Sequence, residues 1–162
     1  CSDIWRISLP TRADVVIASP GGFPRDFDLH QAQKASSVAE MACKRGGHII
    51  IVAETPDGSA KFGKHLKNAN SPEEVVELFK RIGMTADATG KAYMWARGLL
   101  KHRISIVGSR LSKEELREMF FNSYDTLEEA VEDSLKIYGS KASFVVIPHA
   151  SDIFVNIEDE AV

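Results

Sequence analysis

The chain has 162 residues, of which 44% are hydrophobic, and it carries a formal net charge of −3 at pH 7. This length and composition suit one well-buried domain and are too small for two ordinary ones. The mixed charges exclude the basic surface of a nucleic-acid-binding protein, and no apolar run or signal-peptide pattern predicts a membrane protein, so we expect a cytoplasmic one.

The first strongly patterned segment is a strand followed by a glycine-rich turn and a helix. Residues 13–19 are β-branched and apolar on both faces, which indicates an interior strand of a covered sheet. The prolines and glycines of residues 20–24 interrupt regular structure and let the backbone approach a ligand. Asp26 or Asp28 then provides an N-cap, and a helix is predicted over residues 29–45, ending at a pair of glycines.

Three polar residues, His30, Gln31 and Lys34, occupy the first turn of this helix. Residues three and four apart are neighbours on a helix, so their side chains lie close together. They are expected to point past the carboxyl edge of the sheet, where open α/β sheets bind ligands. Free backbone N–H groups, the helix dipole and a lysine favour a carboxylate or phosphate there. The simpler alternative is that these residues are only the solvated side of an amphipathic helix.

Strands and helices alternate along the rest of the chain. Strands are predicted at 48–54, 103–109 and 143–147, with a weaker edge strand at 4–9 and a short strand at 153–155. Helices are predicted at 72–81, 88–102 and 127–138, and a capping box of Ser112 and Glu115 starts one more. This alternation predicts a three-layer α/β/α fold with a mostly parallel sheet of about four to six strands.

Two further features carry weaker functional signals. Gly58, Gly63 and Lys64 have the spacing of a phosphate-binding P-loop, but His65 stands where that loop needs Ser or Thr for magnesium. A loop over the edge of the sheet is therefore the preferred interpretation. His149 follows the last long strand, where a catalytic histidine can lie, although a lone histidine there is more often a bystander. The two cysteines match no disulfide or metal motif and are expected to be reduced and structural.

Several of these segments resemble the carboxyl-terminal domain of nickel-dependent lactate racemase and of related racemases and epimerases that use a nickel-pincer nucleotide. In chain order the resembling segments are SPGGFPRDFDLHQAQKA, GGHIIIVAE, SPEEVVELF, GKAYMWARGL, RISIVGS and SFVVIPHA. The resemblance implies an enzyme that takes a hydride from the α-carbon of a small 2-hydroxy acid and returns it to either face. It also implies that the cofactor is attached to a lysine of an amino-terminal domain, with the active site between the two domains.

The same resemblance implies roles for residues of this chain. Lys34 would hold the substrate carboxylate, and Gln31 would hydrogen-bond the substrate or the cofactor. His30 would also contact the substrate, at a position that is commonly tyrosine in the family. The positions near the cofactor would be Trp95, which the helical period alone leaves in a packing set, Gly21 and Gly22.

This lobe would contain no catalytic residue and no metal ligand, because the family keeps both on the amino-terminal domain, the expected partner. We therefore interpret residues 1–162 as a single α/β domain, the carboxyl-terminal lobe of a longer two-domain enzyme and inactive by itself. Residues 1–12 would be a linker or edge strand, and residues 156–162 a frayed tail. Two alternatives stay open: a non-catalytic module that binds an anion or docks a domain, and a nucleotide-binding protein that uses residues 58–64.

Overall fold

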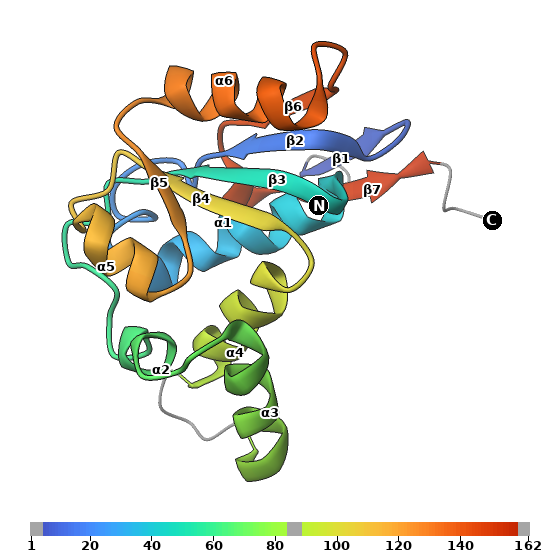
Figure 1. Ribbon diagram of the computed structural model, residues 1–162. Helices are drawn as coiled ribbons and strands as arrows, with labels where there is room; N and C mark the ends of the chain where they lie inside the picture. The colour runs from blue at the N-terminus through green and yellow to red at the C-terminus, as the bar shows by residue number, and fades with distance from the viewer. Residues whose placement is uncertain (1–4, 84–88, 159–162) are drawn as a thin grey trace.

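The chain folds around a five-stranded sheet in which every pair of neighbouring strands is parallel (Figure 1). This computed structural model describes residues 5–83 and 89–158. The strand order is β5-β4-β3-β2-β6. The strands are β2 (Ala13–Ala18), β3 (Cys43–Val52), β4 (Arg103–Val107), β5 (Asn122–Tyr124) and β6 (Phe144–Ile147). A separate parallel pair joins β1 (Arg6–Leu9) to β7 (Phe154–Ile157).

Helices cover both faces of the sheet. α1 (Leu29–Ala42) packs alanines against one face, where Ile49 and Ile51 of β3 lie in the main core. α6 (Leu127–Tyr138) covers the other face, where Ile50 lies in a smaller core with Ala130. Alternate residues of β3 therefore enter opposite cores, which explains why its sequence is apolar on both faces. The predicted three-layer α/β/α fold with a mostly parallel sheet is confirmed.

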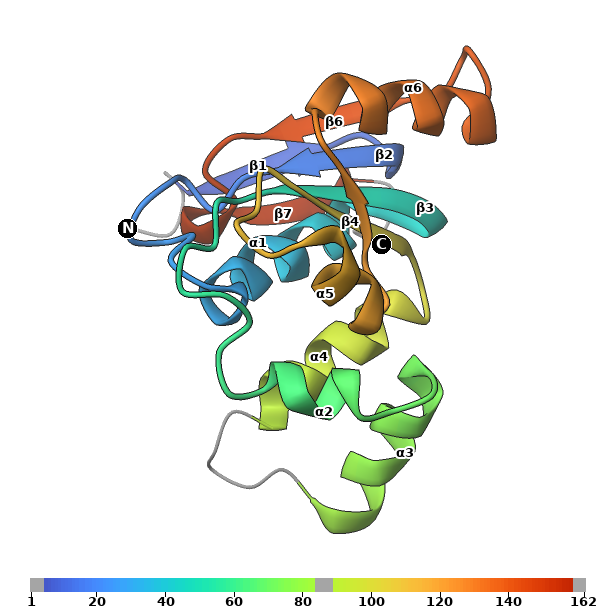
Figure 2. The same cartoon turned by 60° about the vertical axis from the view of Figure 1, so that its left-hand side comes forward.

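Three helices form a group that projects from the α1 side of the sheet (Figure 2). They are α2 (Gly63–Lys67), α3 (Pro72–Ile82) and α4 (Thr89–Leu99). α4 packs against both α3 and α1, so it joins this group to the sheet. The remaining short helices, α5 (Lys113–Glu118) and the 3₁₀ helix η1 (Ala150–Asp152), follow β4 and β6. None of the helices in the described residues is long and apolar enough to cross a membrane.

Side-chain caps set the helix starts that the sequence predicts. Ser71 accepts a hydrogen bond from the backbone N–H of Glu74 and starts α3. Ser112 and Glu115 form the reciprocal capping box at α5, and Thr126 caps α6. A cap satisfies backbone N–H groups that have no partner within the helix, so these short polar residues select the first turn.

The structure corrects several predicted boundaries. α1 ends at Ala42 rather than at residue 45, because Cys43 is extended and pairs with Ala13 of β2. Strand β5 was not predicted, since three residues are too short to show a period. Residues 156 and 157, predicted as tail, belong to β7 and pair with β1. α4 ends at Leu99 rather than at 102, and its predicted start at Ala88 lies outside the described residues, as do Cys1 and residues 159–162.

Candidate functional site

The glycine-rich turn lies at the carboxyl edge of the sheet, as predicted. The backbone N–H of Ser19 donates to the carbonyl of Ile147 in β6, and the N–H of Ala150 donates to the carbonyl of Ser19. The turn therefore starts where the ends of β2 and β6 meet. The Ser19 hydroxyl then accepts a 3.1 Å hydrogen bond from the N–H of Gly21. A second contact, from the N–H of Arg25 to the carbonyl of Gly22, closes the turn.

Two aspartates, both possible N-caps by sequence, have different tasks. Asp28 caps α1: its Oδ1 accepts a 2.7 Å hydrogen bond from the N–H of Gln31. Asp26 is buried and instead holds the loop after β3, because its carboxylate accepts from the N–H of Glu54 and its carbonyl accepts from the N–H of Thr55. The turn before α1 is thereby tied to the loop beside it.

His30, Gln31 and Lys34 lie together on the first turn of α1. The Nζ atom of Lys34 donates a 2.9 Å hydrogen bond to Oε1 of Gln31, and Lys34 is exposed. His30 is half-buried, and burial followed by the charge of Lys91 lowers its pKa, while Asp28 raises it. The predicted group is thus one open, electropositive wall at the start of a 14-residue helix. The roles of its members in substrate binding stay predictions.

Lys91 on α4 belongs to the same group, and the sequence reading missed it. Its Nζ donates a 2.8 Å hydrogen bond to Oε1 of Gln33 on α1. Burial, and then the charge of Lys34, lowers the pKa of Lys91, whereas Asp28 raises it. The sequence did indicate where Lys91 lies: it precedes Trp95 by four residues and so shares a helix face with it.

Trp95 lies beneath the first turn of α1 rather than on its surface. Its indole Nε1 donates a 3.2 Å hydrogen bond to the carbonyl of Leu29, and its ring meets Phe121 edge to face at 4.9 Å. Only 1% of the residue is exposed. The packing expected from the helical period is therefore found, and a contact of Trp95 with a cofactor stays a prediction. Gly21 and Gly22, the other predicted cofactor neighbours, are half-buried in the turn.

His149 lies next to the glycine turn, at the end of β6. A Cβ atom built on Gly21 would be 2.9 Å from Nδ1 of His149, so only glycine leaves room for the imidazole here. Gly21 also has a φ of +108°, a conformation that side chains disfavour. His149 is exposed, close to the turn and on the side of β6. His149 therefore lies at the candidate site, but this position alone does not assign it a catalytic role.

The loop of residues 55–62 does not form a phosphate cradle. A Cβ built on Gly63 would clash with the hydroxyl of Ser59, so a side chain fills the space beside that glycine. The carbonyl of Gly58 faces inward and accepts from the N–H of Leu29, and Phe62 is fully buried. A P-loop instead presents free N–H groups to phosphate. The geometry therefore disfavours the nucleotide-binding interpretation.

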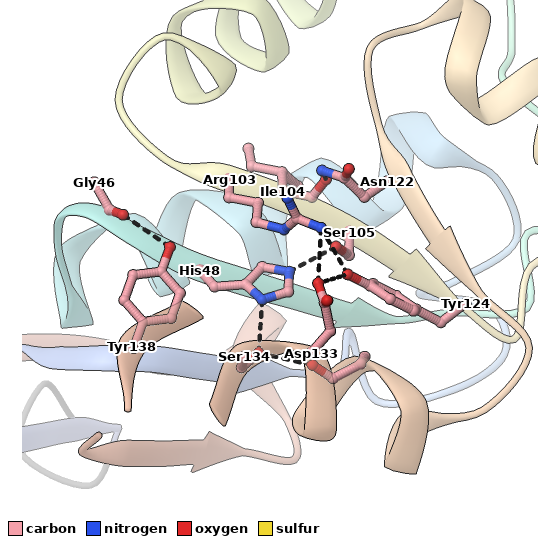
Figure 3. Close-up of polar contacts among 11 residues, drawn as sticks. Gly46, His48, Arg103, Ile104, Ser105, Asn122, Tyr124, Asp133, Ser134 and Tyr138 are labelled. Carbon is pink, nitrogen blue, oxygen red and sulfur yellow. Dashed lines mark hydrogen bonds and ion pairs between the residues drawn. The ribbon is translucent and has the colours of Figure 1, made fainter. Parts of the chain in front are cut away.

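A second polar cluster lies between the sheet and α6 (Figure 3). The Ser134 hydroxyl donates to the carbonyl of Ala130, so it accepts from Nδ1 of His48 at 2.7 Å, and Nε2 of His48 in turn accepts from Ser105 at 2.6 Å. Both His48 and Ser105 are fully buried. A serine–histidine pair with no path to solvent cannot meet a substrate, so this cluster is structural.

Beside His48, Arg103 of β4 contacts both Tyr124 of β5 and Asp133 of α6. Its Nη2 donates to the phenol oxygen of Tyr124 at 2.8 Å and to Oδ2 of Asp133 at 2.9 Å, and the Tyr124 hydroxyl donates to the same carboxylate (Figure 3). Burial and then the charge of Arg103 lower the pKa of His48 to about 4. His48 is therefore neutral at physiological pH.

A cavity of about 560 Å³ lies away from the glycine turn and is lined by residues that include Arg12, Glu40, Cys43 and Arg97. Burial raises the pKa of the free Cys43 thiol to about 12, so this cysteine is unreactive, in line with its expected structural role. Within residues 5–83 and 89–158, no group of three or more His, Cys, Asp or Glu side chains is placed to hold a metal ion.

The fold and the turn define a class: a three-layer α/β domain that presents a capped helix start, with two lysines bonded to glutamine amides, at the carboxyl edge of its sheet. The chain belongs to the lactate racemase C-terminal domain family, whose model matches residues 9–155. The resemblance inferred from the sequence segments is thereby confirmed.

Two curated relatives are lactate racemases. The protein of Thermoanaerobacterium thermosaccharolyticum is 32% identical over 147 residues, and that of Lactiplantibacillus plantarum is 30% identical over the same length. Each alignment covers 88% of this chain and 34% of the relative, so the chain spans about a third of the curated relatives that it matches.

A solved structure of a lactate racemase agrees with this assignment. The lactate racemase apoprotein of Thermoanaerobacterium thermosaccharolyticum superposes with a TM-score of 0.90 at 31% identity, over 96% of this chain and 38% of that one. A crystal structure of a Thermotoga maritima protein superposes with a TM-score of 0.53 at 10% identity, over 95% of this chain and 39% of the other. The second likeness concerns the fold alone.

Proposed function

We propose that this chain is the carboxyl-terminal lobe of a 2-hydroxy-acid racemase or epimerase, in which it supplies contacts to the substrate and the cofactor. Its partner would be the amino-terminal catalytic domain of the same cytoplasmic protein. Family membership and the one-third coverage of the lactate racemases support this proposal. The isolated lobe would be inactive, because the residues that perform the chemistry would lie on the other domain.

The observation that carries the proposal is the first turn of α1. Lys34 is exposed there, and its Nζ bonds to the neutral amide of Gln31. The N–H groups of Leu29 and Gln31 already donate to Gly58 and Asp28, so the charge of Lys34 and the helix dipole are what this turn offers to an anion. A lysine bound to an amide keeps its full positive charge available to an anion. The Lys34 ammonium would bind the carboxylate of the hydroxy acid, and the Gln31 amide would orient its oxygen atoms.

The nickel-pincer nucleotide would be held by the amino-terminal domain. The chemistry that this group supplies when bound is reversible hydride transfer at the α-carbon. Here the turn at Gly21 and Gly22 would place backbone against the cofactor, and the wall formed by α1 would exclude water from one side of the substrate.

Exposed apolar residues in the glycine-rich turn favour the presence of a second domain that packs over the first turn of α1. Phe23 is 75% exposed and meets the partly exposed Phe27 edge to face at 6.1 Å. Exposed aromatic pairs are enriched where another surface docks. This observation also fits the alternative of a non-catalytic docking module. A measurement of racemase activity is therefore needed to distinguish the two functions.

The test uses the full-length, cofactor-loaded protein with Lys34→Ala and Lys80→Met. Loss of the charge-assisted contact at Lys34 raises KM for the hydroxy acid by about ten- to a hundredfold. Lys80→Met is the matched control, because Lys80 lies on α3 and its charge is already paired with Glu77. Unchanged kinetics in Lys34→Ala would contradict the role of Lys34, and absence of any racemase activity would favour the docking module.

A further inference from the structure

A basic cavity lies at the amino edge of the sheet, the edge opposite to the glycine-rich turn. Its volume is about 560 Å³, within the range of about 300–1,000 Å³ that is usual for small-molecule pockets. Five of its lining residues lie at or just before the starts of the parallel strands β2, β3 and β4: Arg12, Cys43, Arg45, Lys101 and His102. The C-terminal parts of α1 and α4 and strand β7 form its other walls.

Positive side chains outnumber carboxylates in this cavity. Arg45, Arg97 and Lys101 are in its lining, and Glu40 is the one carboxylate that lines it among the described residues. Three positive charges and one negative charge leave a net charge of about +2. The side chains of Arg45 and Lys101 make no hydrogen bond or ion pair with residues 5–83 and 89–158. Their charges are therefore available to a ligand.

The ion pair between Arg97 and Glu40 is incompletely formed. Nη2 of Arg97 lies 3.5 Å from Oε2 of Glu40, whereas Arg110 and Glu54 approach to 2.6 Å. Nε of Arg97 and Oε1 of Glu40 are buried and have no hydrogen-bond partner in the described part of the chain. Glu40 thus holds Arg97 through one long contact. Because the Arg97 side chain is 41% exposed, its remaining Nη donors can reach another anion.

The backbone that carries Arg45 and Lys101 is held in place. The N–H of Gly46 donates a 2.7 Å hydrogen bond to the carbonyl of Lys101, which joins the start of β3 to the segment after α4. Residues 43–48 of β3 bulge here against residues 13–15 of β2. Bulges redirect side chains and are frequent next to functional sites. The two free cations are therefore borne by a defined backbone rather than by a loose surface loop.

His102 lies among these cations. One of its ring nitrogens, Nδ1, is 3.1 Å from the carbonyl oxygen of Lys44. Burial lowers the pKa of His102 most, the contact with Lys44 raises it, and the charges of Lys101, Arg45 and Arg12 lower it further. An anion bound beside these cations would offset their charges and raise the pKa of His102. The imidazole therefore provides a measurement of binding that does not depend on enzyme activity.

We propose that this cavity binds a small phosphate ester, at a site separate from the one assigned above to the hydroxy acid. A phosphate monoester carries about two negative charges near pH 7, which matches the net charge of the cavity. Arg45 and Arg97 offer the forked guanidinium donors that bind phosphate in a bidentate manner. Met41, Val155 and Ile157 supply apolar surface for the organic part of the ester. This site goes beyond the proposed function and does not depend on it.

The experiment titrates the full-length, cofactor-loaded protein with ribose 5-phosphate, AMP and acetate by isothermal titration calorimetry. At least one of the two esters is expected to bind, and to bind more tightly than acetate, which carries a single charge. Arg45→Met and Lys101→Met each remove one charge-assisted contact and weaken binding of the ester by about tenfold. Lys80→Met is the matched control, because Lys80 lies on α3 and is paired with Glu77, and it leaves the affinity unchanged.

A second measurement follows the imidazole of His102 by NMR as the pH is varied. The pKa of His102 rises when the bound ester is present, and His102→Gln identifies its signal. Lys34→Ala leaves the affinity for the ester unchanged if the cavity is the site. If Lys34→Ala abolishes binding and Arg45→Met does not, the ester binds at the start of α1 and the inference is wrong. Absence of saturable binding of both esters, or equally tight binding of acetate, would overturn it as well.

Discussion

The indole of Trp95 on α4 supports the first residue of α1 through a 3.2 Å hydrogen bond to the carbonyl of Leu29. Lys91 lies one turn earlier on α4, and its Nζ donates a hydrogen bond to Gln33 of α1. A single face of α4 thus provides both the buried support of the candidate site and one of its charges. The polar residues of the first turn of α1 are positioned by a contact that lies underneath them.

Trp95→Phe tests this support. The substitution keeps an aromatic ring against Phe121 but removes the donor to Leu29, so the free energy of unfolding falls by about 1 kcal/mol. Urea unfolding followed by far-UV circular dichroism measures the change. Trp5→Phe is the matched control, because Trp5 is 52% exposed and its loss changes stability little. Equal stability of the two variants would contradict a supporting role for Trp95.

Asp28 can be tested as the cap of α1. In Asp28→Ala the N–H of Gln31 loses its acceptor, and the free energy of unfolding falls by about 1 kcal/mol. Asp28→Ser keeps a capping oxygen and is expected to restore most of that stability while making the site more positive. Thermal melts of the two variants give the comparison. A serine variant as unstable as the alanine variant would show that the charge, not the cap, matters.

Gly21→Ala is expected to destabilise the turn. The new methyl group would meet the His149 imidazole, and the φ of +108° strains any side chain, so the cost is on the order of 1–3 kcal/mol. Adding His149→Ala removes the clash but not the backbone strain. The double variant should therefore recover only part of the loss in chemical denaturation. Full recovery would show that steric contact accounts for the whole effect.

Acid is expected to destabilise the chain through His48. Its folded-state pKa of about 4 lies below the 6.5 of an ordinary histidine, so above pH 6.5 both the folded and the unfolded chain hold it neutral and it does not lower stability there. As the pH falls from 6.5 towards 4, the unfolded chain binds a proton that the folded chain refuses. The free energy of unfolding then drops by on the order of 3 kcal/mol.

Denaturant unfolding at several pH values measures this drop, with His48→Gln as the control. Glutamine does not titrate, so the variant should start less stable but lose less stability between pH 6.5 and 4. The other histidines with lowered pKa values remain in both proteins and cancel in the comparison. Parallel pH curves for the two proteins would contradict the assignment to His48.

The sequence by itself determined the layered fold and most element positions. Strands such as 48–52 are apolar on both faces, and α6 spans Leu127–Tyr138, as predicted. These features depend on neighbours in the chain, and local patterns report them directly. The turn at Gly21 and the polar first turn of α1 were visible for the same reason.

Only the tertiary structure decided which residues share the site. Lys91 and Gln33 are 58 residues apart in sequence, and their contact exists because α4 packs on α1. The same packing buries Trp95. Strand pairing, another contact between distant segments, places β5 beside β4 and ends α1 at Ala42, where Cys43 joins β2. Contacts between distant segments leave no period in the sequence, so their charges and hydrogen bonds appear only once the helices are packed.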